Sequence, residues 1–278
     1  MIPQKWLKLI KSLQVKKYRK MEQSFVVEGG KNVLELLQSD YEIRLLLATA
    51  DFQRQYAAIL NRKNAATQAT VEIVSEADLA RAGGLQTNNA ALAVAAMQPN
   101  LAIMPSASSM LLAMDGIQDP GNLGTIIRIA DWYGIAGIIC SDDTVDLHNP
   151  KTIAASMGSF TRMPLYYTCL EEYLKKSTTR TTVYGAFLEG DDVHSAGFAQ
   201  AGIVVMGNEA HGIREEIVPY VSRKIHIPRY GGAESLNVGV ATAIICDNWR
   251  RTNSPPVPEG APAPPRKPAC RMDRGGEF

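Results

Sequence analysis

The stretch Met110-Leu-Leu-Ala-Met-Asp-Gly-Ile-Gln-Asp-Pro-Gly-Asn-Leu-Gly-Thr-Ile-Ile-Arg128 decides the fold. Its first five residues form a short apolar run, which predicts a buried strand. A loop rich in polar residues and glycine follows, and residues 123–133 then show the apolar spacing of a helix. A strand that leads through such a loop into a helix is typical of α/β proteins with a mostly parallel sheet.

The same alternation of strands and helices extends to both sides of this stretch. Further strands are predicted at residues 136–140, 183–187, 202–206 and 224–227, and helices at residues 150–158 and 236–250. Residues 24–97 contain a separate set of shorter strands and helices that ends before Pro99. We therefore predict an α/β protein with a domain at 1–98, a linker at 99–109, a second domain at 110–252 and a tail at 253–278.

The predicted tail differs in composition from the rest of the chain. Residues 254–268 hold 7 of the 15 prolines of the sequence. Proline cannot sustain a helix or a sheet ladder, and the segment has too little apolar surface to offset the entropy lost on ordering. We expect the tail to be disordered, and a proline-rich partner motif is the alternative.

The loop that follows the strand at 110–114 has features of an anion site. Gly121 and Gly124 allow close approach of the backbone, and Asn122 lies where a helix N-cap is expected. Arg128 is predicted one turn into the helix, where its guanidinium could reach back and bind a phosphate. Taken alone, the segment favours the simpler interpretation, a capped helix with a solvated arginine.

Two more loops of this kind follow later strands. The first is Gly207-Asn-Glu-Ala-His-Gly212, and the second runs from Ile227 to Val238. Either loop alone would be an ordinary turn between a strand and a helix. In open parallel sheets, however, ligands bind beyond the carboxyl ends of the strands. Three polar, glycine-containing loops at such ends of one domain therefore indicate a functional site.

The three loops together resemble the motifs of the SpoU (TrmH-like) class of RNA ribose 2'-O-methyltransferases. The first family motif, Asn-x-Gly with an arginine after three further residues, is matched by Asn122-Leu-Gly-Thr-Ile-Ile-Arg128. The second, Gly-x-Glu-x-x-Gly, is matched by Gly207-Asn-Glu-Ala-His-Gly212. The third is matched by Ile227-Pro228 and Ser235-Leu-Asn-Val238. One motif alone would be a weak signal, but three in the right order over residues 110–250 form a specific one.

The resemblance also covers the N-terminal part of the chain. Phe25-Val-Val-Glu-Gly-Gly-Lys31 is similar to the start of the L30e-like domain that often precedes this catalytic domain and binds its substrate. The resemblance thus implies an L30e-like RNA-binding domain at 1–98 and an α/β-knot (SPOUT) methyltransferase domain at 110–252. It further implies that the C-terminal segment is threaded through a loop to form a deep trefoil knot.

The resemblance implies a cofactor, a dimer and a set of site residues. The cofactor is S-adenosyl-L-methionine, held in the knot by residues that match Met206, Gly207, Ile227, Leu236 and Asn237. The family acts as a homodimer whose active site is completed at the subunit interface. The catalytic residues would be Arg128, Asn122, Glu209, Ser235 and Asn237.

The family assigns its motif arginine, here Arg128, the role of activating the ribose hydroxyl. A guanidinium gives up its proton with difficulty, so it is a poor base. We therefore expect Arg128 to hold a neighbouring RNA phosphate and to fix the hydroxyl, and that phosphate is a second candidate for accepting the proton.

The chain departs from the family pattern at two places. Many relatives have an arginine near Ala154 or Ala155, and the loop Thr87-Asn-Asn89 lacks a Gln-Gly pair that is often found there. Both places concern the handling of substrate, so they leave the choice of RNA open.

The charge of the chain hides a local excess. The sequence has 29 Lys+Arg and 28 Asp+Glu, but residues 5–20 contain seven basic and no acidic residues. Trp6, Leu7, Ile10 and Leu13 recur at helical spacing, which predicts an amphipathic helix with a basic outer face. That face is either simply solvated or in contact with phosphates.

Other chemistry is not indicated by the sequence. No apolar run is long enough for a transmembrane helix, and the N-terminus lacks the apolar core of a secretory signal. The four cysteines and four histidines have no metal-like spacing, so we expect reduced thiols, no metal and a cytoplasmic location.

Ribosomal RNA is the favoured substrate, because an L30e-like domain is present. The alternatives are a transfer RNA 2'-O-methyltransferase, a catalytically inactive RNA-binding protein of the same fold and, more weakly, a small-molecule methyltransferase. Intact Asn122, Arg128, Glu209, Ser235 and Asn237 argue against the inactive protein.

Overall fold

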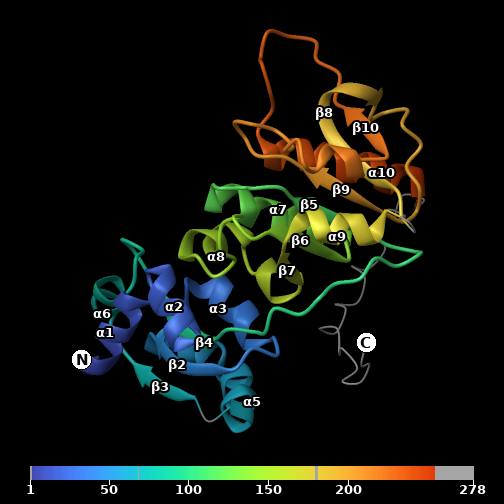
Figure 1. The fold of residues 1–278 in the computed structure, drawn as a ribbon. Helices are drawn as coiled ribbons and strands as arrows, with labels where there is room; N and C mark the ends of the chain where they lie inside the picture. Colours follow the sequence, from blue (N-terminus) through green and yellow to red (C-terminus); the bar gives the residue numbers. More distant parts are fainter. Residues whose placement is uncertain (1, 68, 179–180, 254–278) are drawn as a thin grey trace.

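Two β-sheets organise the chain in a computed structural model that describes residues 2–67, 69–178 and 181–253 (Figure 1). The N-terminal sheet has the strand order β1-β4-β2-β3, and the C-terminal sheet has the order β10-β8-β9-β5-β6-β7. The structure thus has the mixed α/β architecture predicted from the sequence, with one sheet on each side of the predicted linker.

The N-terminal sheet is mixed. Its elements are α1 (Gln4–Ser12), α2 (Lys16–Glu22), β1 (Ser24–Glu28), α3 (Gly30–Leu37), β2 (Ile43–Ala48), α4 (Ala50–Gln55), α5 (Ala57–Thr67), β3 (Thr70–Ile73), α6 (Glu76–Ala82) and β4 (Ala91–Ala96). Strand β4 pairs antiparallel with β1 and β2, and only β2 and β3 are parallel. Alternate residues of the strands face two cores: one is shared with α1 and α6, and the other with α3 and α4.

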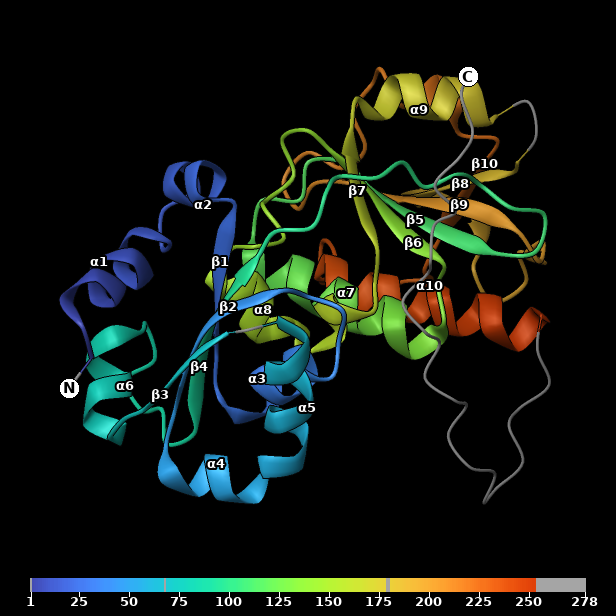
Figure 2. The same cartoon turned by 90° about the horizontal axis from the view of Figure 1, so that it is seen from below.

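The C-terminal sheet is parallel throughout. Its elements are β5 (Met110–Met114), α7 (Pro120–Tyr133), β6 (Gly137–Ser141), α8 (Pro150–Ser156), β7 (Leu165–Thr168), α9 (Leu170–Ser177), β8 (Val183–Asp192), β9 (Gly202–Met206), β10 (Arg223–His226) and α10 (Val238–Asn253). Every strand pair in it is parallel, as the alternation of strands and helices predicts. Helix α9 covers one face, and α7 and α10 cover the other (Figure 2).

Helix α7 begins earlier than the sequence suggested. We expected Asn122 to be the N-cap, but the cap is Asp119, whose Oδ1 accepts a hydrogen bond from the Asn122 backbone N–H at 2.8 Å. Pro120 occupies the first helical position, where its fixed φ suits the helix and its missing N–H costs nothing. Asn122 therefore lies inside the first turn with its side chain free for other contacts, and Arg128 lies about two turns into the helix instead of one.

The basic N-terminal segment is two helices rather than one. The apolar side of α1 is buried, as expected, with Ile10 and Leu13 completely inaccessible. Arg19 of α2, counted with the basic outer face from the sequence, is instead only 2% exposed. Its guanidinium donates to the carbonyls of Leu13 and Gln14, both at 2.9 Å, and to Asp146 Oδ2.

The two sheets are joined by packed contacts rather than by a chain connection alone. Phe25 of β1 contacts the rings of Tyr41, His148 and Phe160, with centroids 4.5 to 6.1 Å apart. Arg162 bonds Glu35 of α3 at 2.5 Å and Asp131 of α7 at 2.8 Å. These contacts place the N-terminal sheet against α7 and α8.

The predicted linker contains no helix or strand, but it is packed along the C-terminal sheet. Asn100 exchanges two hydrogen bonds with the backbone of Tyr167, and the Ile103 carbonyl accepts from Tyr173 Oη at 2.7 Å. The predicted disordered tail lies outside the described residues, except for Asn253, which ends α10. The threading of a knot stays a prediction.

The three described cysteines, Cys140, Cys169 and Cys246, are free thiols, as expected. Burial raises the pKa of Cys246 to about 12 and that of Cys140 further, so these two thiols are poor nucleophiles. Cys270 lies outside the described residues. None of the described helices combines the length and apolar character that crossing a membrane requires.

The ion pair between Arg19 and Asp146 leads to a first prediction. Burial alone would raise the pKa of Asp146, but hydrogen bonds from His148 and Arg19 hold it well below its usual range. The ionised carboxylate therefore stabilises the fold above the ordinary pKa of about 4, and this contribution is lost as the pH falls through the lowered value. Asp146→Ala is expected to lower the free energy of unfolding by about 3 kcal/mol at pH 7, because buried Arg19 loses its counter-ion.

Urea titrations of the wild type and the variant at pH 7 and below pH 4 would measure this difference, which should shrink in acid. Asp51→Ala, at an exposed carboxylate paired with Arg54, is the control and should leave stability nearly unchanged. An equal, small effect of both substitutions at pH 7 would contradict the prediction.

Candidate functional site

Three loops meet at the carboxyl edge of the C-terminal sheet. Residues 115–119 follow β5, residues 207–213 follow its parallel neighbour β9, and residues 227–237 connect β10 to α10. The three polar loops singled out in the sequence are thus brought to one edge by the parallel topology.

A chain of hydrogen bonds links the three loops. Asn122 Nδ2 donates to Glu209 Oε1 at 2.8 Å, and Asn122 Oδ1 accepts from Asn237 Nδ2 at 2.9 Å. Asn237 Oδ1 in turn accepts from the backbone N–H of Gly239 at 2.9 Å in the first turn of α10. Asn122 uses both a donor and an acceptor here, which an aspartate could not do. One residue from each motif therefore belongs to a single polar network.

Two of these loops, at 207–213 and 227–237, line a cavity of about 1230 Å³ together with residues of β8, β10 and α10. Its lining includes six of the residues predicted to bind cofactor or to act in catalysis: Met206, Gly207, Glu209, Ile227, Ser235 and Leu236. Asn122 and Asn237 are connected to it through the hydrogen bond to Glu209. The volume exceeds that of typical small-molecule pockets, so the cavity can hold a nucleoside-sized ligand.

Main-chain groups around the cavity are available to a ligand. Within the described residues, the backbone N–H and carbonyl groups of Gly207, Ile227 and Leu236 form no hydrogen bond. Each residue lies just outside a strand or a helix, where ladder and helix bonds have ended. Unpaired backbone donors and acceptors beside apolar side chains suit a ligand with a polar heterocycle and a carboxylate.

Gly207 is needed because the backbone of its loop passes very close. A Cβ at this position would lie 2.2 Å from the carbonyl carbon of Gly212 and 2.4 Å from the amide nitrogen of Ile213. The loop is closed by two backbone bonds between Asn208 and Gly212, both 2.9 Å long. Gly212 has a φ of +70°, which glycine adopts without strain. Asn208 Nδ2 also donates to the Gly116 carbonyl at 2.6 Å, which joins the loops after β5 and β9.

An ion pair between a buried carboxylate and a half-exposed arginine, not anticipated from the sequence, fixes the end of the 207–213 loop. Asp115 is fully buried, and its carboxylate accepts from the Arg214 backbone N–H at 2.8 Å and from its Nε at 2.6 Å. Burial alone would lower the pKa of Arg214, but the hydrogen bond and charge of Asp115 raise it above its ordinary value. A carboxylate directly after an apolar strand was the available signal, but its partner 99 residues later was not readable.

Replacing Asp115 by asparagine is expected to lower the free energy of unfolding by about 2 kcal/mol, because the buried side chain can no longer accept both hydrogen bonds from Arg214. The 207–213 loop should loosen at the same time and ligand affinity at the cavity should fall. Asp143→Asn is the matched control: Asp143 lies 3.7 Å from the same guanidinium but is 55% exposed, so its loss should cost less than about 1 kcal/mol. Chemical denaturation of both variants makes the comparison, and equal losses would refute a special role for Asp115.

Arg128 stands apart from this network. It is exposed on α7 and forms no ion pair or hydrogen bond with any residue in the described ranges. It is not among the residues that line the cavity. The structure of a single chain thus brings Asn122, Glu209, Ser235 and Asn237 to the cavity edge and leaves the arginine free.

The cavity has one wall that sequence reasoning missed. Residues 186–190 of β8 line it, together with the 207–213 and 227–237 loops. Strand β8 runs to Asp192, and its pairing with β10 shifts register between Lys224 and Ile225. Such an irregularity depends on the neighbouring strand, so local sequence patterns give little sign of it.

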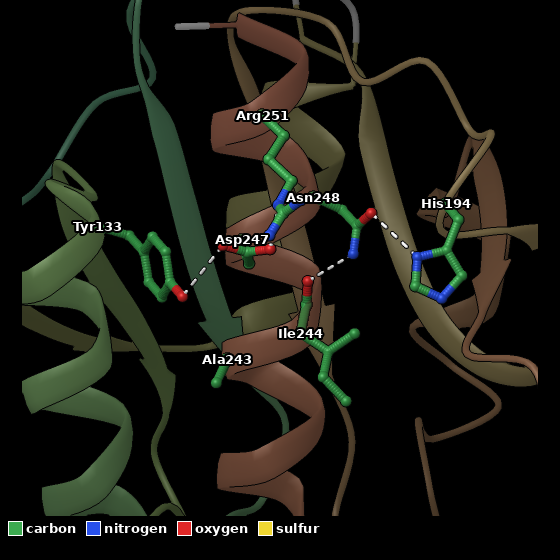
Figure 3. Close-up of a pocket in the computed structure, with 7 residues that line it drawn as sticks. All are labelled: Tyr133, His194, Ala243, Ile244, Asp247, Asn248 and Arg251. Atoms are coloured by element: carbon green, nitrogen blue, oxygen red, sulfur yellow. Dashed lines mark hydrogen bonds and ion pairs between the residues drawn. The ribbon is translucent and has the colours of Figure 1, made fainter. Parts of the chain in front are cut away.

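A smaller hollow of about 460 Å³ lies between α7, α10 and the segment after β8. Figure 3 shows its lining residues: Tyr133, His194, Ala243, Ile244, Asp247, Asn248 and Arg251. Its polar side chains bond to one another or to the helix, as in the Tyr133–Asp247, His194–Asn248 and Arg251–Asp247 contacts. Because these groups are already satisfied, we place the site in the larger cavity.

One of the two alanines that stand where an arginine was expected, Ala155, has a packing role. A Cβ on Gly124 would lie 2.5 Å from the Ala155 Cβ, so α7 and α8 approach closely at this point. A long side chain at position 155 would separate the helices, whereas Ala154 is exposed. Across the described residues, no three His, Cys, Asp or Glu side chains gather in a way that could hold a metal ion.

Comparisons with known proteins match both parts of the chain to known families. The family model for the SpoU rRNA methylase family matches residues 109–247, and that for the MRM3-like substrate-binding domain matches residues 5–93. The 23S rRNA (guanosine(2553)-2'-O)-methyltransferase RlmP of Bacillus subtilis is 30% identical over 242 residues, which are 86% of this chain and 94% of the relative.

Solved structures agree. A Porphyromonas gingivalis structure assigned to the TrmH family of RNA methyltransferases is 35% identical, with a TM-score of 0.78 over 90% of this chain and 99% of the other. An AdoMet-bound rRNA methyltransferase from Sinorhizobium meliloti is 29% identical, with a TM-score of 0.79 over 88% and 94% of the two chains. From the matching model and the relatives along most of its length, the chain belongs to the SpoU rRNA methylase family.

Proposed function

We propose that the protein transfers a methyl group from S-adenosylmethionine to a ribose 2'-hydroxyl of ribosomal RNA. The observation that carries the proposal is the hydrogen-bonded network of Asn122, Glu209 and Asn237 at the edge of a cavity with unpaired backbone groups. The B. subtilis relative is named as a 23S rRNA methyltransferase, and the S. meliloti structure has AdoMet bound. The site and the relatives therefore point to the same reaction.

The residues present fit S-adenosylmethionine. The backbone groups of Gly207, Ile227 and Leu236 would bond the adenine and methionine parts, and Met206 and Ile227 would supply apolar contacts. Asn237, which lies just before α10, would also bind the cofactor. When bound, the cofactor supplies an electrophilic methyl group on a sulfonium. The task that remains for this chain is to place a ribose hydroxyl in line with that methyl group.

The polar side chains would orient the hydroxyl and manage its proton. Asn122, Glu209, Ser235 and Asn237 would form the polar wall beside the ribose, with Asn122 holding the Glu209 carboxylate in position. Arg128, which has no partner in the described part of the chain, would bind an RNA phosphate through its forked donors. The hydroxyl loses its proton as it attacks, either directly to that phosphate or to Arg128 after the guanidinium has itself given up a proton.

We further propose that the active protein is a homodimer. Arg128 lies outside the cavity of its own chain, so a site that needs both could be completed by Arg128 of a second copy. A deep knot in the C-terminal segment belongs to the same proposal. We assign RNA binding to a domain at 1–98, joined by the 99–109 linker to a catalytic domain at 110–252. A ribosomal RNA substrate suits action in the cytoplasm.

The reaction can be tested with the purified protein. Incubation with S-adenosylmethionine carrying a tritiated methyl group and deproteinised ribosomal RNA should label the RNA. A 2'-O-methyl group blocks alkaline cleavage, so the label should appear in dinucleotides that resist alkali. Label in alkali-sensitive mononucleotides would contradict ribose methylation, and label only in transfer RNA would contradict the substrate. If calorimetry detects no binding of S-adenosylmethionine, an inactive RNA-binding protein would be favoured.

A further inference from the structure

Helices α1 and α2 present six exposed lysines to solvent. Lys5, Lys8 and Lys11 lie on one side of α1, and Lys16, Lys17 and Lys20 lie on one side of α2. None of the six has a carboxylate within ion-pair distance among the described residues. The first acidic residue after them is Glu22. We call the six lysines the lysine surface. Such a concentration of unpaired positive charge on 16 residues favours a polyanionic partner.

The apolar side of α1 is not available to a membrane. Ile10 and Leu13 are fully buried, and they pack with Leu45, Leu47 and Val94 of the sheet. An amphipathic helix that binds a bilayer inserts its apolar face among the lipids. Here that face belongs to the core of the N-terminal sheet. The accessible side carries the six lysines, with only Val15, Tyr18 and Met21 as exposed apolar side chains beside them. The lysine charge and the buried apolar face of α1 therefore favour an RNA backbone over a lipid bilayer.

The one basic side chain of the segment that points inward fixes the geometry of the surface. Arg19 donates to the carbonyls of Leu13 and Gln14, the residues between the two helices, and to Asp146 Oδ2. It therefore holds the turn between α1 and α2 and ties α2 to the loop at 142–149. The lysine surface is carried by a fixed element instead of a loose terminus.

The 142–149 loop connects the lysine surface to the candidate active site. It follows β6, so it lies at the same carboxyl edge as the loops after β5 and β9. Gln118 Nε2 donates to the Asp143 carbonyl at 2.9 Å, and Asp143 lies 3.7 Å from Arg214. Arg214 in turn ends the 207–213 loop. Direct contacts thus run from α2 to the cavity wall along one edge of the C-terminal sheet.

We propose that the lysine surface binds the phosphate backbone of RNA and holds it beside the catalytic edge without reading its sequence. This inference rests on the proposed function, because it takes the substrate to be RNA. Lysine ammonium groups are mobile point charges, whereas base recognition uses forked or paired donors and acceptors. The surface should therefore add affinity for any RNA, and the choice of nucleotide should come from elsewhere in the site.

Salt dependence measures such contacts. Each phosphate that a lysine neutralises releases counter-ions, and the slope of log affinity against log salt steepens by about 0.7 to 0.9 per contact. Two fluorescent RNA hairpins of unrelated sequence are titrated with the full chain by anisotropy, across a series of KCl concentrations. The variants are Lys5→Gln/Lys8→Gln/Lys11→Gln, Lys16→Gln/Lys17→Gln/Lys20→Gln, and the combined six substitutions.

Each triple variant should reduce the slope by about 2 and weaken both hairpins at least about tenfold at low salt, and the six substitutions together should do more. The Lys16→Arg/Lys17→Arg/Lys20→Arg variant keeps the charge and should bind like the wild type. Lys175→Gln is the control. It changes an exposed lysine on α9, outside the lysine surface, and should leave the slope unchanged. Thermal unfolding should be similar for all variants, because only surface side chains change.

Unchanged slopes in the triple variants would overturn the proposal. Weakening of one hairpin alone would also overturn it, because it would show base recognition. The proposal would also be overturned if the wild type bound tightly to vesicles with anionic headgroups and its RNA binding did not depend on the lysines. The test is separate from that of the reaction: lysine-dependent RNA binding without methyl transfer would retain the surface and refute the proposed function. Methyl transfer with lysine-independent RNA binding would do the reverse.

Discussion

Arg128→Ala is expected to reduce methyl transfer to RNA by about 100- to 1000-fold, the usual cost of losing one preorganised charged donor at a reaction centre. Affinity for S-adenosylmethionine should stay nearly intact, because Arg128 does not line the cavity. The substitution should also leave the fold unchanged, since the side chain is exposed and bonds no described residue. Single-turnover methylation and calorimetry with the cofactor would separate the two quantities.

Arg128→Lys is the informative comparison. It keeps a positive charge but loses the planar fork that can hold two phosphate oxygens. We expect it to recover part of the RNA affinity and little of the rate. Full turnover in Arg128→Ala would remove Arg128 from the catalytic site, and a matching loss of cofactor affinity would assign it to the cofactor instead.

Gly207→Ala is expected to abolish cofactor binding. The added methyl carbon would lie within 2.4 Å of backbone atoms of Gly212 and Ile213, and backbone cannot move aside as a flexible side chain can. The 207–213 loop would have to open, which breaks its two closing bonds with Asn208 and displaces the backbone groups that face the cavity. Calorimetry should detect no binding of S-adenosylmethionine, and methylation should be lost with it.

Gly232→Ala provides the matched control. Gly232 lies in the loop between β10 and α10, and a Cβ there would meet nothing within 4 Å. Its φ is not in the left-handed region, and it does not line the cavity, so cofactor affinity should be close to that of the wild type. Normal affinity in Gly207→Ala, or an equal loss in both variants, would show that the 207–213 loop does not form the cofactor site as proposed.

The sequence allowed much of the C-terminal domain to be predicted, because its strands are strongly apolar and are separated by clear turn signals. The strands at 110–114 and 202–206 match β5 and β9 residue for residue. The start of α7 was wrong: Asp119 and Asn122 are both good caps, and the choice depended on Pro120 at the first helical position.

The loops of the candidate site were predictable, but the contacts that shape them were not. Gly207, Glu209 and Ser235 could be placed at strand ends from local pattern alone. Three features depend on residues far apart in the chain: the Asp115–Arg214 pair, the burial of the Arg19 side chain against Asp146, and the cavity wall formed by β8. Local propensity carries no information about such partners, whereas the resemblance to a family pointed to the residues through their order and spacing.

The central claim is that this chain methylates ribose in ribosomal RNA, and a map of 2'-O-methyl groups in cells tests it most directly. Ribosomal RNA would be compared from cells that lack the gene, cells with the wild-type gene restored, and cells with the Arg128→Ala variant. We predict that at least one 2'-O-methyl group is missing without the gene, returns with the wild type and does not return with the variant. An identical methylation map of ribosomal RNA in all three would contradict the account.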